Sequence, residues 1–384
     1  MIPYSRQCLD EADINSVINV LRSDFLTQGP QVPAFENALA EYVSAPYAFA
    51  VNSATSALHL ACLALDLGPG DLLWTSPNSF VASANCALYC GAQVDFVDID
   101  PHTYNLSPSA LADKLLKAKR IGKLPKVVVP VHFAGQSCDM RFIAHLAAEY
   151  GFKVLEDASH AIGGRWEGNL VGGCQYSDIT VFSFHPVKII TTAEGGLLTT
   201  RDAQIAQRLA NLRSHGITKD PQRLQRCDQG AWYYEQQSIG YNYRMTELQA
   251  ALGLSQLTKL DRFVASRHNL VTRYREGLAG LPLVMPYQHP DSYSAFHLFV
   301  IKTADSSPLD RRMLFDTLRN AGIMVNVHYI PIHLQPYYSR MGFKAGDFPN
   351  AEAYYQRAIS LPLYPGLTDT DQNYVTAKLK DSFK

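Results

Sequence analysis

Hydrophobic and polar positions follow two alternating patterns between about residue 47 and residue 157. Short apolar runs, rich in β-branched and aromatic residues, are typical of strands, and the longer runs between them have the spacing of amphipathic helices. The predicted strands are residues 47–51, 71–76, 93–99, 126–131 and 153–157, and the predicted helices are residues 55–67, 79–91, 107–119 and 139–151. Apolar strands that alternate with helices predict an α/β fold with a mostly parallel sheet covered on both faces.

The stretch TVFSFHPVKIITTAEGGLLTT, residues 180–200, predicts two more short buried strands with a single lysine between them. Ser183 precedes this lysine, Lys188, and one acidic residue and two glycines follow it. A structural lysine prefers a solvated helix face. The position of Lys188 between two apolar strands therefore indicates a function.

The pattern changes after residue 245. A long helical stretch, which we expect to bend near Gly253, is followed by apolar segments and by one further helix, DRRMLFDTLRNAG. This order predicts a smaller α+β domain. We therefore expect a large domain at residues 1–260, including the N-terminal segment, and a small C-terminal domain at residues 261–384.

Composition and charge exclude several classes of protein. The 34 basic and 35 acidic residues give a formal net charge of −1, which argues against a nucleic-acid or membrane-surface partner. No run of about eighteen apolar residues predicts a membrane span, and the N-terminus lacks the apolar stretch of a signal peptide. The cysteines are Cys8, Cys62, Cys86, Cys90, Cys138, Cys174 and Cys227. Because they are scattered and form no CxxC pair, we expect reduced thiols in a cytoplasmic protein, without disulfides or a zinc site.

Polar residues follow three of the predicted strands, at the sheet edge where ligands bind in open parallel sheets. The run NSATS, residues 52–56, opens a helix and is either an anion site or an ordinary N-cap cluster. Asp157 ends a buried strand beside Glu156, either as a carboxylate with a charged partner or as a turn residue. Lys188 is either a nucleophile toward a carbonyl or a surface-loop lysine.

A phosphate site, a carboxylate and a lysine on one sheet edge together fit pyridoxal 5′-phosphate. Lys188 would bind the cofactor aldehyde as an imine, and Asp157 would pair with the ring nitrogen and keep it protonated. The residues expected at the phosphate are Ala54, Thr55 and Ser183. Phe80 either lies over the cofactor ring or fills a core position.

At these residues the chain resembles the DegT/DnrJ/EryC1/StrS sugar aminotransferases, which have the fold-type-I, aspartate-aminotransferase-like architecture. The resemblance extends nearly from end to end. Its segments include LTQGPQVPAFENALAEY, VNSATSALHLA, EDASHAIGG, FSFHPVKIITTAEGG and GYNYRMTELQAALGLSQL. The combination of these segments in one order is specific, whereas no single segment would be.

The resemblance implies a role for each matching residue. Lys188 carries the cofactor and moves the proton, Asp157 holds the ring nitrogen, and Phe80 and His160 flank the ring. Asn242 reaches the phosphate of the neighbouring subunit's cofactor, which implies a homodimer with shared active sites. The residues implied for the nucleotide-sugar are Tyr4, Phe25, Leu26, Thr27, His328, Tyr329 and Tyr338.

Within the family, the chain most resembles the branch that makes UDP-4-amino-4,6-dideoxy-N-acetyl-β-L-altrosamine in pseudaminic acid biosynthesis. VNSATSAL, EDASHA, FSFHPVK and TTAEGG carry this resemblance, and many relatives have glutamine where this chain has His160. It implies transfer of an amino group from an amino acid, expected to be L-glutamate, to C4 of a UDP-linked 4-keto-6-deoxy-N-acetylhexosamine.

Two other functions stay open at this point. One is an aminotransferase of the same family that acts on another nucleotide-linked keto sugar. The other is a cofactor-binding regulator without turnover, against which the intact Lys188 and Asp157 argue.

Three arginines have two possible roles each. They either bind a diphosphate or donor carboxylate or are ordinary surface charges, and they are Arg201, Arg213 and Arg244. His328 and His333 do not have the spacing of a usual metal-ligand pair, so no metal is expected.

Overall fold

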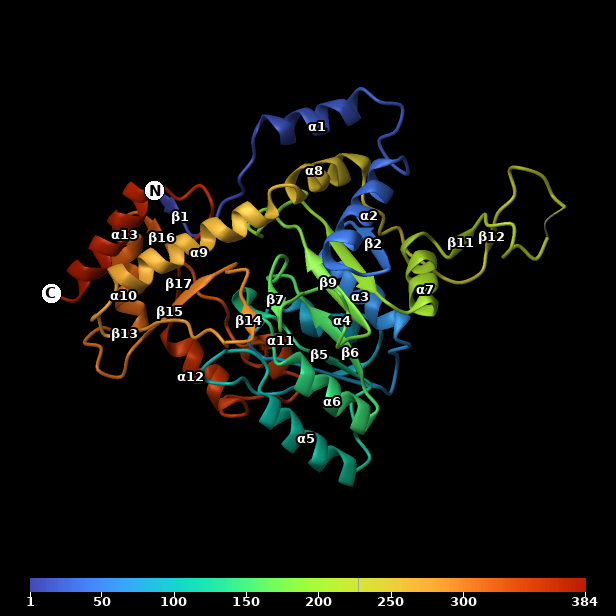
Figure 1. Cartoon of the computed structure of the whole chain (residues 1–384). Helices are drawn as coiled ribbons and strands as arrows, with labels where there is room; N and C mark the ends of the chain where they lie inside the picture. The colour runs from blue at the N-terminus through green and yellow to red at the C-terminus, as the bar shows by residue number, and fades with distance from the viewer. Residues whose placement is uncertain (227) are drawn as a thin grey trace.

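The predicted alternation of strands and helices forms a seven-stranded sheet in the computed structural model, which describes residues 1–226 and 228–384 (Figure 1). The strands lie in the order β2 (Tyr47–Val51), β10 (Gly196–Thr200), β9 (Ile179–Ser183), β6 (Lys153–Asp157), β5 (Val127–Val129), β3 (Leu72–Thr75) and β4 (Gln93–Phe96). β10 is antiparallel to both of its neighbours, and the other pairs are parallel. Residues 184–195 join β9 to β10 without a crossover helix, so the chain reverses its direction there. The mostly parallel sheet is confirmed.

Helices cover both faces of this sheet. The elements on the first face are α3 (Ala54–Ala64), α4 (Ala82–Tyr89) and α7 (Ala203–Arg213). The elements on the second face are α5 (Pro108–Arg120), α6 (Met140–Tyr150), α2 (Gln31–Val43) and α8 (Glu247–Leu257). Successive side chains of a strand alternate between the faces, so Val127 and Val129 pack on the first face and Val128 packs on the second.

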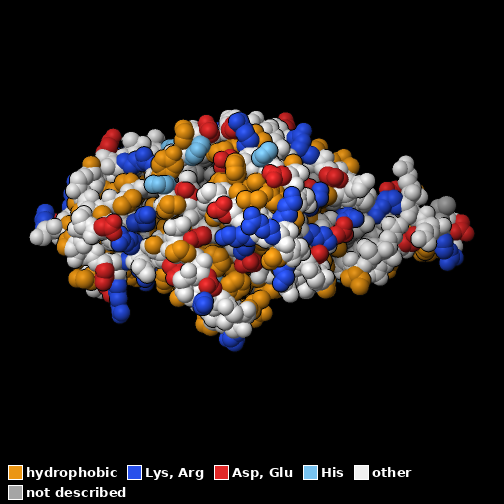
Figure 2. Space-filling model, turned by 90° about the horizontal axis from the view of Figure 1, so that it is seen from below, with side chains coloured by type: hydrophobic (Ala, Val, Ile, Leu, Met, Phe, Trp, Pro, Cys, Tyr) orange, Lys and Arg blue, Asp and Glu red, His pale blue; other side chains and the backbone are white. Residues whose placement is uncertain are grey.

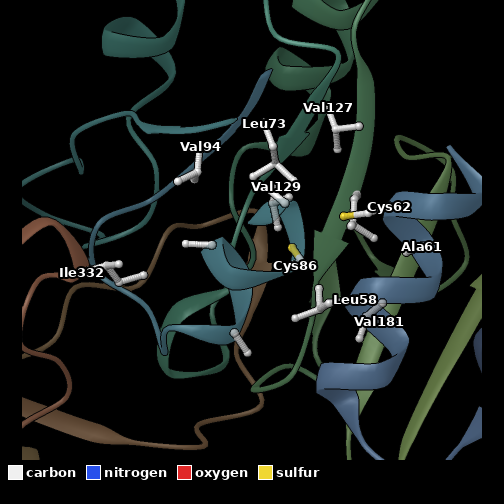
Figure 3. Packing of buried hydrophobic residues seen from close by; sticks show 14 of the residues in the cluster. Leu58, Ala61, Cys62, Leu73, Cys86, Val94, Val127, Val129, Val181 and Ile332 are labelled. Carbon is white, nitrogen blue, oxygen red and sulfur yellow. The ribbon is translucent and has the colours of Figure 1, made fainter. Parts of the chain in front are cut away.

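Small and branched side chains pack the first face closely. Leu58 and Cys62 of α3 and Cys86 of α4 belong to one buried cluster with Val127 and Val129 (Figure 3). Small residues let α3 and α4 approach the strands, because little side-chain volume separates the backbones. This packing holds the N-termini of α3 and α4 at the carboxyl edge of the sheet.

The C-terminal part is built on a second, smaller sheet. Its elements are α9 (Leu260–Gly277), β13 (Leu283–Val284), β15 (Phe299–Thr303), α10 (Arg311–Asn320), β16 (Ile323–Met324), α11 (Pro336–Ser339), α12 (Pro349–Arg357), β17 (Ala358–Leu361) and α13 (Asp369–Ser382). The N-terminal strand β1 (Ile2–Pro3) pairs in parallel with β16, so the first residues of the chain lie against this part. The division at residue 260 stays a prediction.

The long helical stretch after residue 245 breaks at a different place from the one expected. α8 ends at Leu257 and α9 begins at Leu260, whereas Gly253 lies inside α8. A Cβ atom at Gly253 would lie 2.8 Å from the ring of Phe35. The glycine therefore serves the close contact between α2 and α8, and the bend near Gly253 is wrong.

Two further small groups of elements extend the body of the molecule. They are α1 (Glu11–Leu21), which lies against α8, and the strands β7 (Arg165–Trp166), β8 (Asn169–Leu170) and β14 (Ser292–Tyr293), which form a three-stranded sheet. No helix of the described residues is long and apolar enough to cross a membrane.

An arm projects from the body between α7 and α8. It contains the antiparallel pair β11 (Ile217–Thr218) and β12 (Glu235–Gln236) and stands away from the rest of the chain in Figures 1 and 2. Cys227 belongs to this segment but lies outside the described residues. On the face seen in Figure 2, basic and acidic side chains are interspersed, in keeping with the near-zero net charge.

Candidate active site

A cavity of about 500 Å³ opens at the carboxyl edge of the large sheet. The ends of β6 and β9, the N-termini of α3 and α4, and residues 326–329 from the C-terminal part meet there. The predicted residues that line it are Tyr4, Ala54, Thr55, Phe80, Asp157, His160, Ser183, Lys188, His328 and Tyr329. The structure thus brings the three separate sequence features, the NSATS run, Asp157 and Lys188, into one cavity.

Lys188 lies in the loop between β9 and β10, where its backbone N–H donates to the carbonyl of His185. Burial lowers the pKa of Lys188 to about 8, and the nearby negative charge of Asp157 opposes this shift only in part. Near pH 7 about 10% of such an amine is neutral, compared with about 0.03% at the ordinary pKa. A neutral amine is the form that attacks a carbonyl, so burial in the cavity increases the fraction of Lys188 that could react with one.

This lowered pKa predicts the pH dependence of cofactor attachment. The rate at which cofactor-free protein takes up pyridoxal 5′-phosphate at Lys188 should rise with pH and level off above about pH 8, because the amine loses its proton there. Borohydride trapping between about pH 6 and pH 10 measures this rate. A lysine-containing peptide serves as the control, and its rate should still be rising near pH 10. A protein profile that follows the peptide's would contradict a desolvated Lys188.

Asp157 is the carboxylate of β6 that faces the cavity. Its side chain is 4% exposed, its Oδ2 accepts a hydrogen bond from Ser83 Oγ at 2.6 Å, and its Oδ1 accepts one from the backbone N–H of Ser159 at 3.1 Å. Both oxygens are thus oriented by the chain. A fixed carboxylate at this edge can stabilise a positive ring nitrogen.

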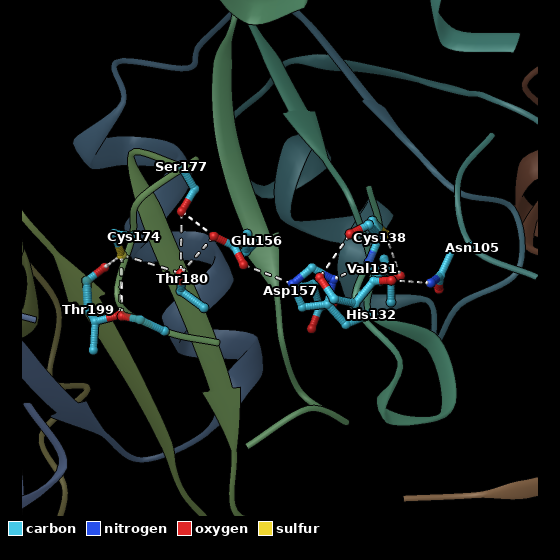
Figure 4. Close-up of polar contacts among 12 residues, drawn as sticks. Asn105, Val131, His132, Cys138, Glu156, Asp157, Cys174, Ser177, Thr180 and Thr199 are labelled. Atoms are coloured by element: carbon cyan, nitrogen blue, oxygen red, sulfur yellow. Dashed lines mark hydrogen bonds and ion pairs between the residues drawn. The ribbon is translucent and has the colours of Figure 1, made fainter. Parts of the chain in front are cut away.

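Glu156, its neighbour, faces the other way into a buried polar network (Figure 4). Its Oε2 lies 2.8 Å from His132 Nε2, and Thr180 Oγ1 donates to its Oε1 at 3.2 Å. His132 Nδ1 accepts from the backbone N–H of Cys138, so Nε2 carries the proton that Glu156 accepts. Glu156 therefore connects β6 to the segment after β5 and to β9, and of the two carboxylates at the end of β6 Asp157 is the one that lines the cavity.

The NSATS run serves both as a helix cap and as part of the cavity wall. Ser53 is the N-cap of α3, and its Oγ accepts from the backbone N–H of Ser56 at 3.1 Å. Ala54 and Thr55 begin the helix and line the cavity, close to Ser183. The first N–H groups of a helix have no partner within it and attract anions. The two interpretations of this run are therefore compatible.

Gly196 allows β10 to lie directly against this helix terminus. A Cβ atom there would be 2.6 Å from Ala54 N and 2.6 Å from Ser53 C, which are backbone atoms that cannot turn aside. Gly196→Ala should therefore displace the start of α3, weaken cofactor binding about tenfold and reduce the free energy of unfolding by about 1–3 kcal/mol. Urea unfolding and cofactor titration measure both effects. Gly68→Ala is the control, because nothing lies within 4 Å of Gly68, and equal results for the two variants would contradict the prediction.

The three buried histidines that line the cavity are His160, His297 and His328. His160 Nδ1 accepts from the backbone N–H of Ala134, and its Nε2 lies 3.1 Å from the hydroxyl of Tyr329. Burial and the charge of Lys188 hold the pKa of His160 well below its usual range and lower that of His328 to about 3. These rings are thus neutral near pH 7, which lets them pack against a flat ligand without adding charge.

Two residues that line the cavity and contact predicted residues were not themselves predicted from the sequence. His297 packs behind His160 with the ring centroids 4.3 Å apart, and its pKa is also held well below its usual range by burial. Ser83 contacts Asp157. The polar residue in the apolar run AFHLFVIK was a signal for His297, whereas a small hydroxyl residue in SFVASAN carried none that distinguished Ser83.

Tyr338 lies in a second cavity, of about 540 Å³, next to the first. Val81 lines this second cavity, and its chain neighbours Phe80 and Ala82 line the first. The other lining residues are Asn85, Leu88, Tyr89, Gln335, Pro336, Tyr337 and Tyr338. The Tyr338 hydroxyl donates to Asn85 Oδ1 at 2.5 Å. Of the predicted nucleotide-sugar contacts, Tyr338 therefore lines the second cavity, whereas Tyr4, His328 and Tyr329 line the first.

Four predicted residues lie outside both cavities of this chain. They are Phe25, Leu26, Thr27 and Asn242, and all four side chains are exposed. The candidate arginines do not line the cavities either. Arg201 donates to the backbone carbonyls of Ser44 and Gly173, Arg213 pairs with Glu36, and Arg244 donates to Ser214 Oγ.

The histidine and cysteine side chains were considered as metal ligands or disulfide partners in the predictions above. Among the described residues, no group of three or more His, Cys, Asp or Glu side chains could hold a metal ion. His333 pairs with Glu352 at 2.9 Å, and His328 Nδ1 lies 2.7 Å from Ser360 Oγ. The six cysteines that the structure describes are free.

Known proteins resemble this chain over its full length. The DegT/DnrJ/EryC1/StrS aminotransferase family model matches residues 7–380. The spore coat polysaccharide biosynthesis protein SpsC of Bacillus subtilis is 40% identical over 100% of this chain and 97% of its own length. The UDP-4-amino-4,6-dideoxy-N-acetyl-β-L-altrosamine transaminase of Campylobacter jejuni is 36% identical over 98% of this chain and 96% of its own.

Solved structures agree with these matches. Helicobacter pylori PseC, an aminotransferase of pseudaminic acid biosynthesis, superposes with a TM-score of 0.90 at 32% identity and covers 100% of this chain and 99% of its own. A sugar aminotransferase from Streptococcus pneumoniae, Spr1654, superposes in its pyridoxal phosphate form with a TM-score of 0.89 at 29% identity, covering 99% of this chain and 98% of its own. The fold is thus that of known pyridoxal phosphate-dependent aminotransferases.

Proposed function

The chain belongs to the DegT/DnrJ/EryC1/StrS aminotransferase family, and from this premise we propose that it aminates C4 of a UDP-linked 4-keto-6-deoxy-N-acetylhexosamine. The amino donor is an amino acid, L-glutamate, and the product is UDP-4-amino-4,6-dideoxy-N-acetyl-β-L-altrosamine, a precursor of pseudaminic acid. Membership of this family makes the protein a pyridoxal 5′-phosphate-dependent sugar aminotransferase. The regulator without turnover is therefore set aside.

One observation supports the chemistry most directly. Lys188, with its pKa lowered to about 8, shares a cavity with Asp157 and with the N-terminus of α3. Three chemical groups of pyridoxal 5′-phosphate, the aldehyde, the ring nitrogen and the phosphate, call for an amine, a carboxylate and an anion site. The residues present fit the cofactor. When bound, it supplies an electron sink that stabilises a carbanion beside the amino group.

Each residue of the site would have a separate role in the reaction. Lys188 holds the cofactor, and its free amine removes the proton from Cα of the donor and later delivers a proton to C4 of the sugar. Asp157 keeps the ring nitrogen protonated. Ala54, Thr55 and Ser183 hold the phosphate, which fixes the ring position. Phe80 and the neutral His160 cover the ring and exclude water.

The second cavity suits the nucleoside of the substrate. Tyr89 and Tyr337 expose 52% and 55% of their side chains beside the buried Tyr338, which provides aromatic faces for a base. Asn85 and Gln335 add amide donors and acceptors. Tyr4, His328 and Tyr329 line the first cavity, where the sugar would meet Lys188. This arrangement favours a substrate that is long enough to reach from one cavity to the other.

A second copy of the chain would complete the site. Of the described residues that line the first cavity, Lys188 is the only lysine or arginine, although a diphosphate and a donor carboxylate both need cations. The arm carries Lys219, Arg223 and Arg226, and its Trp232 is 77% exposed. Exposed apolar side chains and missing cations both favour a homodimer in which Asn242 serves the neighbouring site.

Mixing two inactive variants tests this homodimer. Lys188→Ala and Asn242→Ala chains should each be impaired alone, but a mixed dimer contains one site with both residues intact. After subunit exchange, a 1:1 mixture should recover about a quarter of the wild-type rate, because half of the dimers are mixed. Sedimentation gives the assembly state. A monomer, or a mixture no more active than the sum of its parts, would contradict the shared site.

A different sugar is the second candidate, favoured by the 40% identity to a spore coat polysaccharide protein. The same residues would act on another nucleotide-linked keto sugar with a different shape around the reacting carbon. We expect the choice to depend on residues around the second cavity, such as residues 335–338 at the start of α11, rather than on Lys188 or Asp157.

The test of the proposed function is a panel of keto sugars. The purified protein is incubated with L-glutamate and with UDP-linked and dTDP-linked 4-keto and 3-keto sugars, and products are identified by mass and NMR. We expect the 4-amino altrosamine derivative at the highest kcat/KM. Faster amination of another sugar would replace this substrate and leave the aminotransferase chemistry intact.

A further inference from the structure

Asp157 is held by a row of buried hydroxyl groups at the start of α4. Ser83 Oγ lies 2.6 Å from Asp157 Oδ2, and Ser79 Oγ lies 2.7 Å from Ser83 Oγ. The serine side chains are only 1% and 4% exposed, and both residues line the first cavity. The row therefore joins α4 directly to the carboxylate of β6.

The direction of each hydrogen bond in this row follows from the chemistry of its members. An ionised carboxylate only accepts, so Ser83 must donate its single hydroxyl proton to Asp157. Ser79 must then be the donor in its contact with Ser83. Both protons point toward the carboxylate, and each bond polarises the next in a site of low dielectric.

The side chains around Ser83 indicate that its hydroxyl has a specific hydrogen-bonding role. Its helical neighbours Ala82, Ala84 and Ala87 are small and apolar, and all are buried. A buried hydroxyl costs free energy unless it is hydrogen-bonded, and a buried helical serine can satisfy its hydroxyl by bonding to a carbonyl one turn earlier. Ser83 instead reaches across to another element, so α4 contributes a polar group to Asp157 as well as packing.

The two oxygens of Asp157 are thus held from different sides. Ser83 binds Oδ2 from α4, and the backbone N–H of Ser159 binds Oδ1 from the loop after β6. Two bonds on two oxygens define the rotation of the carboxylate plane. Each oxygen keeps a further lone pair with which to accept a third group.

We propose that Ser83, supported by Ser79, is a positioning residue that holds Asp157 in the orientation in which it meets the ring nitrogen of the cofactor. The proposal rests on the role proposed above for Asp157. Ser83 itself does not touch the reacting atoms. Its loss would leave a carboxylate that is free to rotate and less able to keep the ring nitrogen protonated.

The test uses the cofactor-loaded enzyme in five forms: wild type, Ser83→Ala, Ser83→Thr, Ser79→Ala and Asp157→Ala. The readouts are the pH at which the visible absorbance of the bound cofactor changes, the Kd of the cofactor, and kcat. Cys86→Ala is the matched control, because Cys86 lies one turn further along α4, is fully buried, and hydrogen-bonds to the backbone carbonyl of Ser83 rather than to its hydroxyl.

Ser83→Ala should reduce kcat about tenfold and move the absorbance change to higher pH, because a ring nitrogen without its proton withdraws less charge. Ser83→Thr keeps the hydroxyl and should restore both values. Ser79→Ala should reduce kcat by about twofold or less, and it should move the absorbance change to higher pH by less than Ser83→Ala does. Cys86→Ala should leave the absorbance change at the wild-type pH.

The proposal is overturned if Ser83→Ala matches Cys86→Ala in all three readouts, because packing alone would then explain Ser83. If Ser83→Ala does not fold, an unchanged absorbance profile of Ser79→Ala overturns it instead. An unchanged Asp157→Ala would show that the proposed role of Asp157 has failed, whereas a damaged Asp157→Ala beside a normal Ser83→Ala refutes the positioning role alone.

Discussion

Lys188→Ala is expected to reduce the transamination rate about ten-thousandfold or more, because one side chain both holds the cofactor and transfers the proton. Folding should be retained, since the substitution removes an amine whose burial already opposes its charge. The rate is measured with L-glutamate and the keto sugar, and circular dichroism checks the fold.

The position of the covalent link is tested independently of turnover. Borohydride reduction of the native enzyme, followed by digestion and mass spectrometry, should label the peptide that contains Lys188, and the label should be absent from Lys188→Ala. Lys114→Ala is the control, since Lys114 is also partly buried but pairs with Asp95 at 2.7 Å on another part of the surface. A label on a different lysine, or wild-type turnover by Lys188→Ala, would exclude the assignment.

Asp157→Ala is expected to reduce kcat by about a hundredfold to a thousandfold, because the ring nitrogen loses the carboxylate that stabilises its positive charge. Cofactor should still bind, since Lys188, Ala54 and Thr55 remain. Stopped-flow absorbance of the half-reaction with L-glutamate separates this chemical step from sugar binding.

The neighbouring carboxylate provides a sharp control for Asp157. Glu156→Gln keeps an acceptor for His132 Nε2 and lies in the buried network away from the cavity, so its kcat should stay near the wild-type value. Its free energy of unfolding should fall, because a charged partner is lost from a buried pair. If Glu156→Gln lost as much activity as Asp157→Ala, the loss would be explained by a disturbed structure at the end of β6 rather than by the charge of Asp157.

The sequence was most informative where local pattern and chemistry agree. β2 and β6 occupy the predicted residues 47–51 and 153–157 without change, and the helices differ from prediction by a few residues at their ends. The polar residues after these strands could be assigned to one edge, because strands joined by crossover helices run in the same direction. Their combination pointed to the cofactor before any contact was known.

The same hydrophobic pattern could not predict contacts between segments that are distant in the sequence. Glycine at position 253 predicted a bend, but the ring of Phe35, more than two hundred positions earlier, makes glycine necessary for packing. Similarly, β1 pairs with β16 and brings Tyr4 to the cavity wall from the opposite end of the chain. Local periodicity contains no information about such pairs.

The amino-acid sequence alone determined the order of strands and helices, and it determined which residue types stand at the strand ends, because both depend on side-chain periodicity and on neighbouring residues. The tertiary structure alone decided where Tyr338 lies, which hydroxyl holds Asp157, and which buried side chains Glu156 contacts. These outcomes depend on how α4 and the C-terminal part pack on the sheet, and that packing joins residues far apart in the chain. Alternation along a strand places adjacent side chains on opposite faces, but only the packed fold makes one face a cavity and the other a core.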